Sequence, residues 1–438
     1  MSFTVFERNI LMDCIKVVLV GAGDRARTYA QYALENPDKM QVVGLVDPRK
    51  EAITVGKKLY GVPDEHCFSS VEEFLKAPRF ADAIINGTMD NLHVQTTLPL
   101  LNAGYDVLLE KPFAISDEEV DALCEAAKRN KRFVMICHVL RYAPFYNLIK
   151  RQLLTGKIGD IINIQMSEEV SYHHMAASYV RGKWSSEKLC FAPMLLAKCC
   201  HDVDLMIWFN SDTVAKSVAS FGSNFQFTPE RRPAGSADRC ADCRLERDCQ
   251  FSAFKHYIER GTWGQYVWTC FDGRDNVTKE DKINSLKGDN QYGRCVWACK
   301  EHDIVDHQSV IVNFANGSTG SLNMIGGASE GVRDIRIVGT KGEIIGNFKK
   351  QKFAVQIINP DVPEMFTREE FDANETTDID GMTGGHGGGD LRLAADFIDY
   401  LRTGESSIAC TEVGVSAIGH KIVFAAERSR KTGEIVKI

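Results

Sequence analysis

The sequence predicts an α/β protein with an N-terminal parallel sheet and a C-terminal α/β part built on a large, open, mainly antiparallel sheet. The first prediction rests on alternating apolar and amphipathic stretches across residues 15–137, which are typical of βαβ units. The second rests on successive strand-like segments between residues 159 and 358, whose connections are mostly too short for helical crossovers. Because 438 residues exceed one ordinary core, we expect two domains, at residues 1–137 and 138–438.

The apolar patterning places the expected elements along the chain. In the N-terminal part we expect strands at residues 16–20, 41–46, 83–86, 106–109 and 133–136, and helices at 25–34, 51–59, 94–103 and 117–130. In the C-terminal part we expect strands at 161–170, 215–227, 307–314, 319–324, 332–338, 343–346 and 353–358, and helices at 195–209, 390–401 and 412–431. A polar, cysteine-bearing insert covers about residues 228–300, and the glycine-rich stretch 383–389 reads as a flexible connection or as backbone that passes close to a ligand.

Composition argues against several classes of partner. The formal net charge is -7, from 52 basic and 59 acidic residues, which gives no electrostatic reason to expect nucleic acid or an anionic membrane. No apolar run approaches the roughly 18 residues that a membrane helix needs. The first 13 residues lack a signal-peptide core, so we expect a cytoplasmic protein.

A glycine turn follows the first predicted strand and opens the first predicted helix. Gly21 permits a tight turn, and Gly23 lets backbone approach a ligand where a Cβ would intrude. Asp47, at the end of the second strand, is placed to accept hydrogen bonds from ribose hydroxyls, so the pattern predicts a dinucleotide site. Asp47 favours NAD because it would repel a 2′-phosphate, whereas Arg49 and Lys50 leave NADP possible. The cofactor-binding candidates here are Gly21, Ala22, Gly23, Asp24, Arg25, Asp47 and Arg49.

Two further segments carry groups suited to proton transfer. Glu110-Lys111-Pro112 follows the strand at 106–109, at the edge where an open α/β sheet binds ligands, and Lys111 could donate a hydrogen bond to a substrate oxygen. On the predicted helix 195–209, His201 shares a face with Lys198 and a second face with Asp204. A histidine titrates where a general base is useful, so we predict His201 as the base and Asp204 as its orienting partner.

The glycine turn with Asp47, the Glu110-Lys111-Pro112 motif and the segment carrying His201 together resemble the Gfo/Idh/MocA oxidoreductases, from residue 15 onward. The resemblance implies a Rossmann domain followed by an α/β domain whose open sheet builds a homodimer or homotetramer. It implies nicotinamide-dependent oxidation of sugars and polyols, with Lys111 contacting substrate and nicotinamide and His201 as catalytic base. It also implies that a loop lines the cofactor and that an acid lies beside the ribose, at positions Thr88, Asn91, His93 and Glu110.

One position departs from the pattern of many family members. Ala197 stands where they carry an aspartate, and Lys198 follows it, as in a subgroup with Leu-Ala-Lys before Cys-His-Asp. We therefore hypothesise that Lys198 and Lys111 together set the pKa of His201, with Asp204 as a local counter-charge.

The remaining motifs predict substrate contacts and a possible metal site. An exposed loop around residues 173–184 offers donors and aromatic faces that suit a polyhydroxylated or anionic substrate, from His174, Tyr179, Arg181 and Trp184. The insert holds a Cys-x2-Cys pair with further cysteines at metal-ligand spacing, and zinc or reduced thiols both fit Cys240, Cys243, Cys249 and Cys295.

The resulting prediction is an NAD(P)-dependent oxidoreductase that transfers a hydride between nicotinamide and a sugar, polyol or derivative. One alternative is an NAD-dependent glycosidase with no net redox change, which would release a sugar leaving group without accumulating NADH. The other alternative is a nucleotide-sensing regulator without catalysis, against which the presence of Lys111 and His201 argues.

Overall fold

A computed structural model describes residues 14–272, 274–299, 301–375 and 385–438. The chain divides into two compact units. The first unit comprises residues 1–156, 207–209 and 371–421, and the second comprises residues 157–206, 210–370 and 422–438. No helix in the described ranges has the length and apolar character needed to span a membrane.

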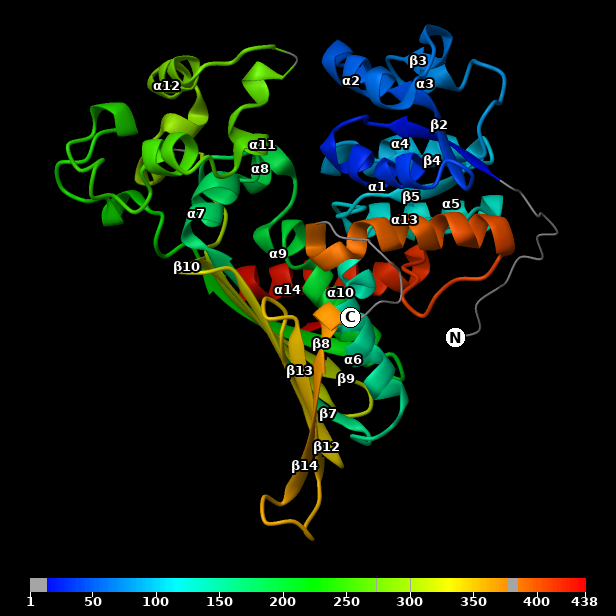
Figure 1. Cartoon of the computed structure of the whole chain (residues 1–438). Coiled ribbons are helices and arrows are strands. Elements are labelled where there is room, and N and C mark those ends of the chain that lie inside the picture. The colour runs from blue at the N-terminus through cyan, green and yellow to red at the C-terminus, as the bar shows by residue number, and fades with distance from the viewer. Residues whose placement is uncertain (1–13, 273, 300, 376–384) are drawn as a thin grey trace. The chain divides into compact units, whose positions relative to one another are not determined.

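The first unit is built on a six-stranded parallel sheet with the strand order β3-β2-β1-β4-β5-β6, shown in blue and cyan in Figure 1. The predicted N-terminal parallel sheet is therefore confirmed. Its strands are almost entirely buried because helices cover both faces, which is why they read as continuous apolar runs. The strands are β1 (Ile15–Val20), β2 (Met40–Val46), β3 (Cys67–Phe68), β4 (Ala83–Asn86), β5 (Asp106–Leu109) and β6 (Val134–Ile136).

The helices of the first unit include two that come from the end of the chain. Helix α13 packs along α1 and is drawn in orange beside the parallel sheet in Figure 1. Helix α5 starts as predicted, since Ser116 Oγ accepts a hydrogen bond from the backbone N–H of Glu119 at 3.2 Å. The sequence patterning did not identify α6. The helices are α1 (Asp24–Glu35), α2 (Lys50–Tyr60), α3 (Val71–Phe74), α4 (His93–Asn102), α5 (Asp117–Asn130), α6 (Pro144–Leu154), α13 (Gly385–Thr403) and the first part of α14 (Val413–Thr432).

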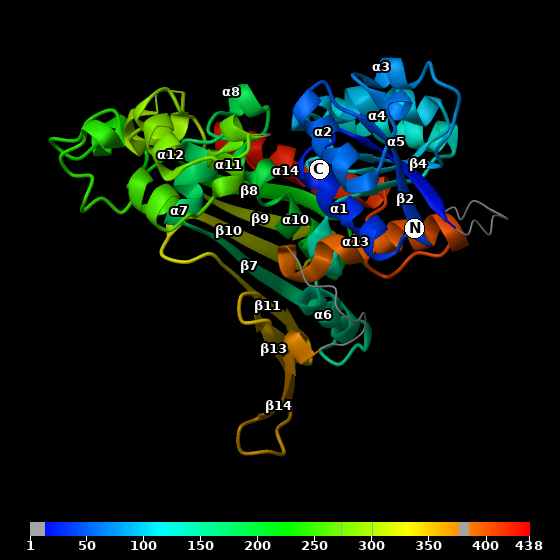
Figure 2. The ribbon, with the colours of Figure 1, turned by 45° about the horizontal axis from the view of Figure 1, so that its top comes forward.

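The second unit is built on a nine-stranded sheet with the order β14-β13-β12-β11-β7-β10-β9-β8-β15, fanned out in Figure 2. The pairing of β7 with β10 is parallel. The pairings from β13 through β12 and β11 to β7, and from β10 through β9 and β8 to β15, are antiparallel, which confirms the large, mainly antiparallel sheet. The strands are β7 (Ile161–Ser171), β8 (Ala215–Ser223), β9 (His307–Phe314), β10 (Thr319–Ala328), β11 (Val332–Gly339), β12 (Gly342–Asn347), β13 (Lys352–Ile358), β14 (Phe366–Asp372) and β15 (Val436–Lys437).

One face of this sheet is buried, and the other is exposed. On the buried face Met206 of α10 (Cys200–Phe209) packs so closely on β10 that a Cβ at Gly320 would lie 2.3 Å from its sulfur. The opposite face exposes the apolar side chains of Phe221, Ile311 and Ile345, which the strand pairings place on the same side of the sheet. An apolar side chain on an otherwise solvated sheet face is a candidate contact with another protein surface.

Two expectations about local structure are wrong, and a third lies partly outside the described residues. The predicted helix 195–209 is two helices, α9 (Met194–Ala197) and α10, because the backbone leaves helical geometry at Cys199, with φ -94° and ψ 5°. The stretch around 173–184 is not an exposed loop but consists of helical turns, α7 (Tyr172–His174) and η4 (Met175–Val180), most of which are buried. The glycine-rich stretch lies partly outside the described residues, and its described end starts α13, where a Cβ at Gly389 would lie 2.2 Å from the carbonyl oxygen of Val139.

The cysteine-bearing insert forms a small apolar core of its own against η4. Its regular pieces include η7 (Phe254–Glu259), α11 (Gly264–Val267) and α12 (Lys279–Lys287), the last opened by a capping box from Thr278 to Asp281. Further buried positions join this core, namely Ala177, Cys240, Ala253, Tyr257, Val267, Leu286 and Tyr292. The aromatic content of the insert therefore supplies packing within the second unit.

Candidate functional site

The predicted glycine turn lies between β1 and α1 and requires glycine at its first position. Gly21 has a φ of +70°, and a Cβ there would lie 2.7 Å from the backbone nitrogen of Thr88, so only glycine fits. Gly23 is the N-cap of α1 and has no side chain to cap the helix. The first N–H groups of α1 and the positive end of its dipole therefore remain available to an anion.

The acidic residue at the end of β2 is present as predicted, and it is paired with an arginine. Asp47 is buried, and its Oδ1 accepts hydrogen bonds from the backbone N–H of Arg49 at 2.9 Å and from Nε at 3.1 Å. Its Oδ2 accepts from Nη2 of Arg49 at 3.2 Å. The guanidinium of Arg49 is itself exposed, and its Nη2 would lie 3.4 Å from a Cβ at Gly23. Asp47 and Arg49 thus lie together beside the glycine turn.

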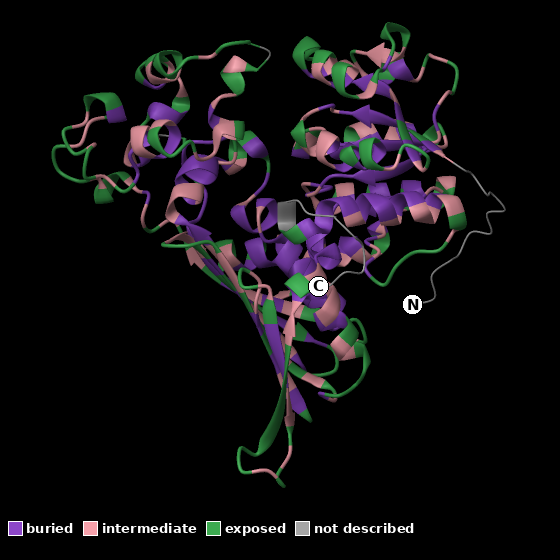
Figure 3. Cartoon of the chain, in the orientation of Figure 1, coloured by how far each residue is buried: buried purple, intermediate pink, exposed green. Residues whose placement is uncertain are grey.

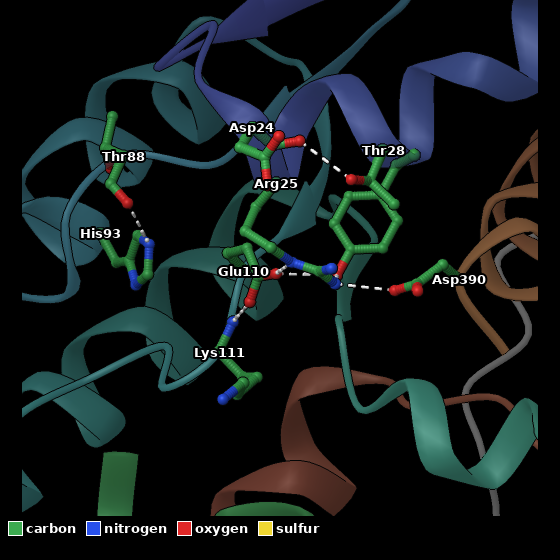
Figure 4. Close-up of polar contacts among 9 residues, drawn as sticks. Asp24, Arg25, Thr28, Thr88, His93, Glu110, Lys111 and Asp390 are labelled. Carbon is green, nitrogen blue, oxygen red and sulfur yellow. Dashed lines mark hydrogen bonds and ion pairs between the residues drawn. The ribbon is translucent and has the colours of Figure 1, made fainter. Parts of the chain in front are cut away.

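Arg25, a predicted cofactor residue, is partly exposed and pairs with two buried carboxylates. Its Nε donates to Oε1 of Glu110 at 2.6 Å, and its Nη2 donates to Oδ1 of Asp390 at 2.7 Å (Figure 4). The hydroxyl group of Tyr29 donates a hydrogen bond to Oε1 of Glu110 at 2.8 Å. Burial raises the pKa of Glu110, but the charges of Arg25 and Lys111 and the hydrogen bonds from Arg25 and Tyr29 outweigh it and hold that pKa below its ordinary value. Glu110 is therefore a fixed carboxylate at the end of β5.

Lys111 follows this carboxylate directly. Its backbone N–H donates to Oε2 of Glu110 at 2.6 Å, and Figure 4 shows its side chain extending away from that carboxylate. The peptide bond between Lys111 and Pro112 is cis. His93 is fully buried, and its ring nitrogens lie 2.7 Å from the carbonyl oxygen of Pro112 and 3.1 Å from that of Thr88. One histidine thus links the loop after β4 to the loop after β5.

The loop after β4 is held by side-chain hydrogen bonds. Asn86 Oδ1 accepts from both the backbone N–H and the hydroxyl of Thr88, at 3.2 and 2.9 Å. Asn91 lies partly exposed in the short helix η2 (Asp90–Leu92) that follows. The glycine turn, Asp47, this loop and Lys111 all follow carboxyl ends of strands of one parallel sheet, which is the edge where such sheets bind ligands.

In the second unit, the predicted histidine lies in the first turn of α10. His201 and Asp204 are both buried, with exposed fractions of 3% and 2%. Lys198 lies before the helix, and its Nζ forms an ion pair with Oε1 of Glu168 on β7 at 3.2 Å. The charge of Lys198 is therefore balanced by a carboxylate that the sequence prediction did not include.

Glu168 belongs to a buried network of alternating charges. Its Oε2 is paired with Nε of Arg333 on β11, which lies opposite Glu168 in the strand pairing. The same nitrogen donates to Oδ1 of Asp202 at 2.8 Å, and Asp202 is completely buried. Burial raises the pKa of Asp202, and the charge of Arg333 opposes that rise. The network contains two cations and two carboxyl groups, so it can be buried with little net charge.

Two of the predicted substrate residues, His174 and Tyr179, pack against aromatic side chains of the second unit. His174 stacks on Trp263 with ring centroids 4.2 Å apart, and burial together with the charges of Lys198, His173 and Arg333 lowers its pKa well below 6.5. Tyr179 is buried, and its ring lies 6.1 Å from that of Trp184.

Arg181 is buried rather than exposed. It donates hydrogen bonds to backbone carbonyls of Arg294 at 2.6 Å and Phe251 at 2.8 Å, and to the Tyr257 hydroxyl at 3.2 Å. Because these acceptors lie in the insert, Arg181 attaches η4 to the insert.

The predicted zinc site at Cys240, Cys243, Cys249 and Cys295 is not supported. Within the described ranges, no group of three or more His, Cys, Asp or Glu side chains is arranged to hold a metal ion. The Arg181 guanidinium lies 3.5 Å from Cys240 Sγ, where its positive charge opposes a second cation. Cys249 Sγ instead accepts a hydrogen bond from the backbone N–H of Phe251 at 3.4 Å.

Comparison with known families agrees with this arrangement. The profile described as "Oxidoreductase family, NAD-binding Rossmann fold" matches residues 15–138, and its companion, "Oxidoreductase family, C-terminal alpha/beta domain", matches residues 150–438. The chain belongs to the Gfo/Idh/MocA oxidoreductase family. The predicted Rossmann domain and the predicted family are thus both confirmed.

Relatives within the Gfo/Idh/MocA family include proteins with named activities. The chain is 26% identical over 365 residues to a protein named as oxidoreductase YteT of Bacillus subtilis (strain 168), covering 81% of each chain. It is 27% identical over 293 residues to glucose-6-phosphate 3-dehydrogenase of the same strain, covering 60% of this chain and 79% of that one. A solved levoglucosan dehydrogenase in complex with NADH and levoglucosan has the same fold, with a TM-score of 0.70, 17% identity and coverage of 97% and 99%.

Several buried polar residues of this Gfo/Idh/MocA protein were missed by sequence reasoning. Glu168 gave a signal, because it occupies a core-facing position in the alternation of 161–170, between Met166 and Val170. Asp202 was visible within the His201 motif but was not selected. Arg333 and Asp390 gave no local signal, because each reaches its partner only through the tertiary fold.

Proposed function

We propose that this protein is an NAD-dependent dehydrogenase that transfers a hydride between nicotinamide and a carbinol carbon of a sugar, polyol or derivative. The observation that carries the proposal is the edge of the parallel sheet, where the glycine turn, Asp47 and the Glu110-Lys111-Pro112 segment follow the ends of β1, β2 and β5. Dinucleotide binding needs the glycine turn and Asp47. A regulator that only senses a nucleotide does not need the lysine of the Glu110-Lys111-Pro112 segment. Residues 1–137 would supply cofactor binding, and residues 138–438 would supply substrate binding and assembly.

The residues at this edge fit NAD. The N–H groups at the start of α1 would donate hydrogen bonds to the pyrophosphate. Because Gly23 has no Cβ, the pyrophosphate would be able to approach the backbone there closely. Asp47 would accept hydrogen bonds from the adenosine ribose hydroxyls, while Thr88, Asn91 and His93 would line the nicotinamide half and Glu110 its ribose. Asp47 disfavours a 2′-phosphate, whereas the exposed Arg49 guanidinium would attract one. We therefore expect tighter binding of NADH than of NADPH, and a smaller difference in an Asp47→Ser variant.

The chain's own groups would handle the proton. NAD, when bound, supplies a hydride acceptor at nicotinamide C4. We propose that the Lys111 ammonium donates a hydrogen bond to the reacting substrate oxygen and that His201 takes the hydroxyl proton. Lys198 would lower the proton affinity of the histidine and Asp204 would raise it, with Glu168 limiting the effect of Lys198.

The substrate class is supported by the named relatives. Glucose-6-phosphate 3-dehydrogenase and levoglucosan dehydrogenase are both named for carbohydrate substrates. In this chain, the rings of His174, Tyr179 and Trp184 offer apolar faces and hydrogen-bonding edges of the kind that sugars contact. Arg181 is not included, because its donors are directed to the insert.

We also propose a homodimer or homotetramer that forms through the open face of the nine-stranded sheet. Phe221, Ile311 and Ile345 on that face have exposed fractions of 69%, 54% and 37%, and covering them with a second copy would remove apolar area from water.

The function is tested by adding NAD⁺ and a panel of inositols, aldoses, anhydrosugars and sugar phosphates to the purified protein. NADH absorbance with at least one polyol or sugar supports the proposal. Release of an aglycone from glycosides without NADH would instead indicate the redox-neutral glycosidase. Tight NADH binding with neither reaction would indicate a regulator and would overturn the proposal.

A further inference from the structure

The backbone that carries Lys111 is held at three successive residues by three different side chains. We refer to residues 111–113 as the Lys111 segment. The Glu110 carboxylate accepts a hydrogen bond from the backbone N–H of Lys111 at 2.6 Å, and Nδ1 of His93 lies 2.7 Å from the carbonyl oxygen of Pro112. The third residue, Phe113, donates its N–H to Nε2 of His420 at 3.2 Å. The two histidines come from α4 and α14, so distant parts of the first unit converge on one short segment.

His420 is the least expected of these three partners. It lies in the interior of α14, is completely buried, and packs against the Phe113 ring with the ring centroids 4.0 Å apart and the planes tilted by 39°. An aliphatic side chain at this position of a buried helix could pack without burying a polar ring. Since Nε2 accepts a hydrogen bond, it carries no proton, and the imidazole is neutral in this arrangement.

The surroundings of His420 agree with a neutral ring. Burial lowers its pKa well below 6.5, and the charges of His138, Lys111 and His93 act in the same direction, while a hydrogen bond with the Ser416 backbone acts against them. A protonated His420 would lose its acceptor for the Phe113 N–H and would place a second cation near the Lys111 ammonium. The neutral form therefore both accepts the hydrogen bond and avoids repelling Lys111.

We propose that His420 is a positioning residue that fixes the Lys111 ammonium by holding the backbone N–H of Phe113. Pro112 has a fixed φ, so few backbone torsions separate the held N–H from the Lys111 side chain. A displacement of about 1 Å at a reacting group costs roughly 100-fold in rate. The inference deepens the proposed function and rests on the proposed role of Lys111.

The test compares His420→Leu, which removes the acceptor but keeps an apolar side chain, with His420→Gln, whose amide oxygen can accept from Phe113. His66→Leu is the matched control, because His66 also binds a backbone group of the first unit, the Val43 carbonyl, with Nδ1 at 3.0 Å. All proteins are reductively methylated with ¹³C-formaldehyde. The dimethyl-lysine signal of Lys111 is assigned by its loss in a Lys111→Arg variant. Turnover of the substrate found in the panel and the Kd of NADH are measured on unmethylated protein.

We expect His420→Leu to shift the Lys111 signal and to lower kcat at least about tenfold, with the NADH Kd changed less than about twofold. His420→Gln should recover part of both effects, and His66→Leu should change neither. A folded His420→Leu protein with an unshifted Lys111 signal and wild-type kcat would overturn the inference. If His420→Leu does not fold, His420→Asn, whose amide is too short to reach Phe113, replaces it in the comparison with His420→Gln, and equal Lys111 signals in those two variants would also overturn it.

The two proposals can fail separately. If Lys111→Met retains full turnover, the proposed role of Lys111 fails, whatever the methyl spectra show. If Lys111→Met loses turnover while the His420 variants behave like wild type, only the positioning role of His420 fails.

Discussion

Alanine substitutions at three glycines of the first unit test why the turn after β1 needs glycine. Gly21 and Gly23 lie in that turn, and Gly61, at the end of α2, is the control. Gly21 and Gly61 have nearly the same φ, +70° and +69°, but a Cβ at Gly21 would meet the backbone of Gly87 and Thr88 at 2.7–2.8 Å, whereas a Cβ at Gly61 meets nothing within 4 Å. Gly23 has an ordinary φ of -79°, and its nearest neighbour is the end of the Arg49 side chain at 3.4 Å. Gly61→Ala therefore tests backbone strain alone, Gly21→Ala tests strain together with overlap, and Gly23→Ala tests the close approach of a ligand.

The magnitudes follow from these contacts. Left-handed geometry costs alanine roughly 1–2 kcal/mol, and the stiffer unfolded chain returns about 0.4–1 kcal/mol, so Gly61→Ala should lose about 1 kcal/mol of unfolding free energy. Gly21→Ala adds an overlap with backbone, typically about 1–3 kcal/mol, for a total loss of about 2–4 kcal/mol. Gly23→Ala should leave stability within about 0.5 kcal/mol of wild type, because a flexible side chain can move aside.

Urea unfolding measures these stabilities, and NADH fluorescence titration measures affinity. We expect Gly61→Ala to bind NADH like wild type, Gly23→Ala to bind at least about tenfold more weakly, and Gly21→Ala to lose both stability and affinity. The reasoning would be refuted by Gly23→Ala binding NADH normally, because the pyrophosphate would then not approach that Cα. Equal destabilisation by Gly21→Ala and Gly61→Ala would refute the overlap with Thr88.

Three further predictions concern charge and burial. Glu168→Gln leaves Lys198 and Arg333 with one carboxylate fewer, so the unfolding free energy should fall by about 3–5 kcal/mol. The control Glu369→Gln, at an exposed ion pair with Lys157, should change the unfolding free energy by less than about 1 kcal/mol. Equal effects of the two substitutions in urea unfolding would contradict the burial argument. His174 and His420 have pKa values lowered in the fold, so the unfolded chain binds more protons below 6.5, and stability should be full above pH 6.5 and fall as the pH drops below it. That slope should become smaller in His420→Gln, and an unchanged slope would contradict it. Arg181→Met should destabilise the insert, so a protease should cleave within residues 228–300 faster than in wild type. The control is Arg244→Met, because Arg244 is exposed. Equal cleavage rates in the two variants would show that Arg181 does not attach the insert.

Local spacing was sufficient to predict that the glycine turn, Asp47 and Lys111 follow the ends of strands in one parallel sheet. Gly21, Asp47 and Lys111 each follow a short apolar run, and parallel strands bring the ends of such runs to one edge whatever the connecting segments contain. The pattern requires no long-range contact to be known. The same holds for the seven strand-like segments that predicted the large, mainly antiparallel sheet, because a strand with one buried face alternates apolar and polar residues. Strands β14 and β15 of that sheet were not predicted.

The partners of these residues could not be predicted in the same way. Arg25 was assigned to the cofactor from its place after the turn, but it pairs with Asp390, which is 365 residues away. The ion pair between Glu168 and Arg333 depends on the register of β7 and β11. The helix break at Cys199 is not marked by a proline or a glycine in the sequence. Helical spacing therefore does not apply between Lys198 and His201, which lie on either side of the break.

The central claim is that Lys111 and His201 handle the proton of the oxidised hydroxyl. Single-turnover NADH formation with the substrate from the panel, measured for wild type, Lys111→Met and His201→Asn beside their NADH affinities, tests it most directly. We predict that hydride transfer slows by about 10²–10⁴-fold in each variant, while the NADH Kd stays within about threefold. Wild-type hydride transfer in either variant would contradict the claim.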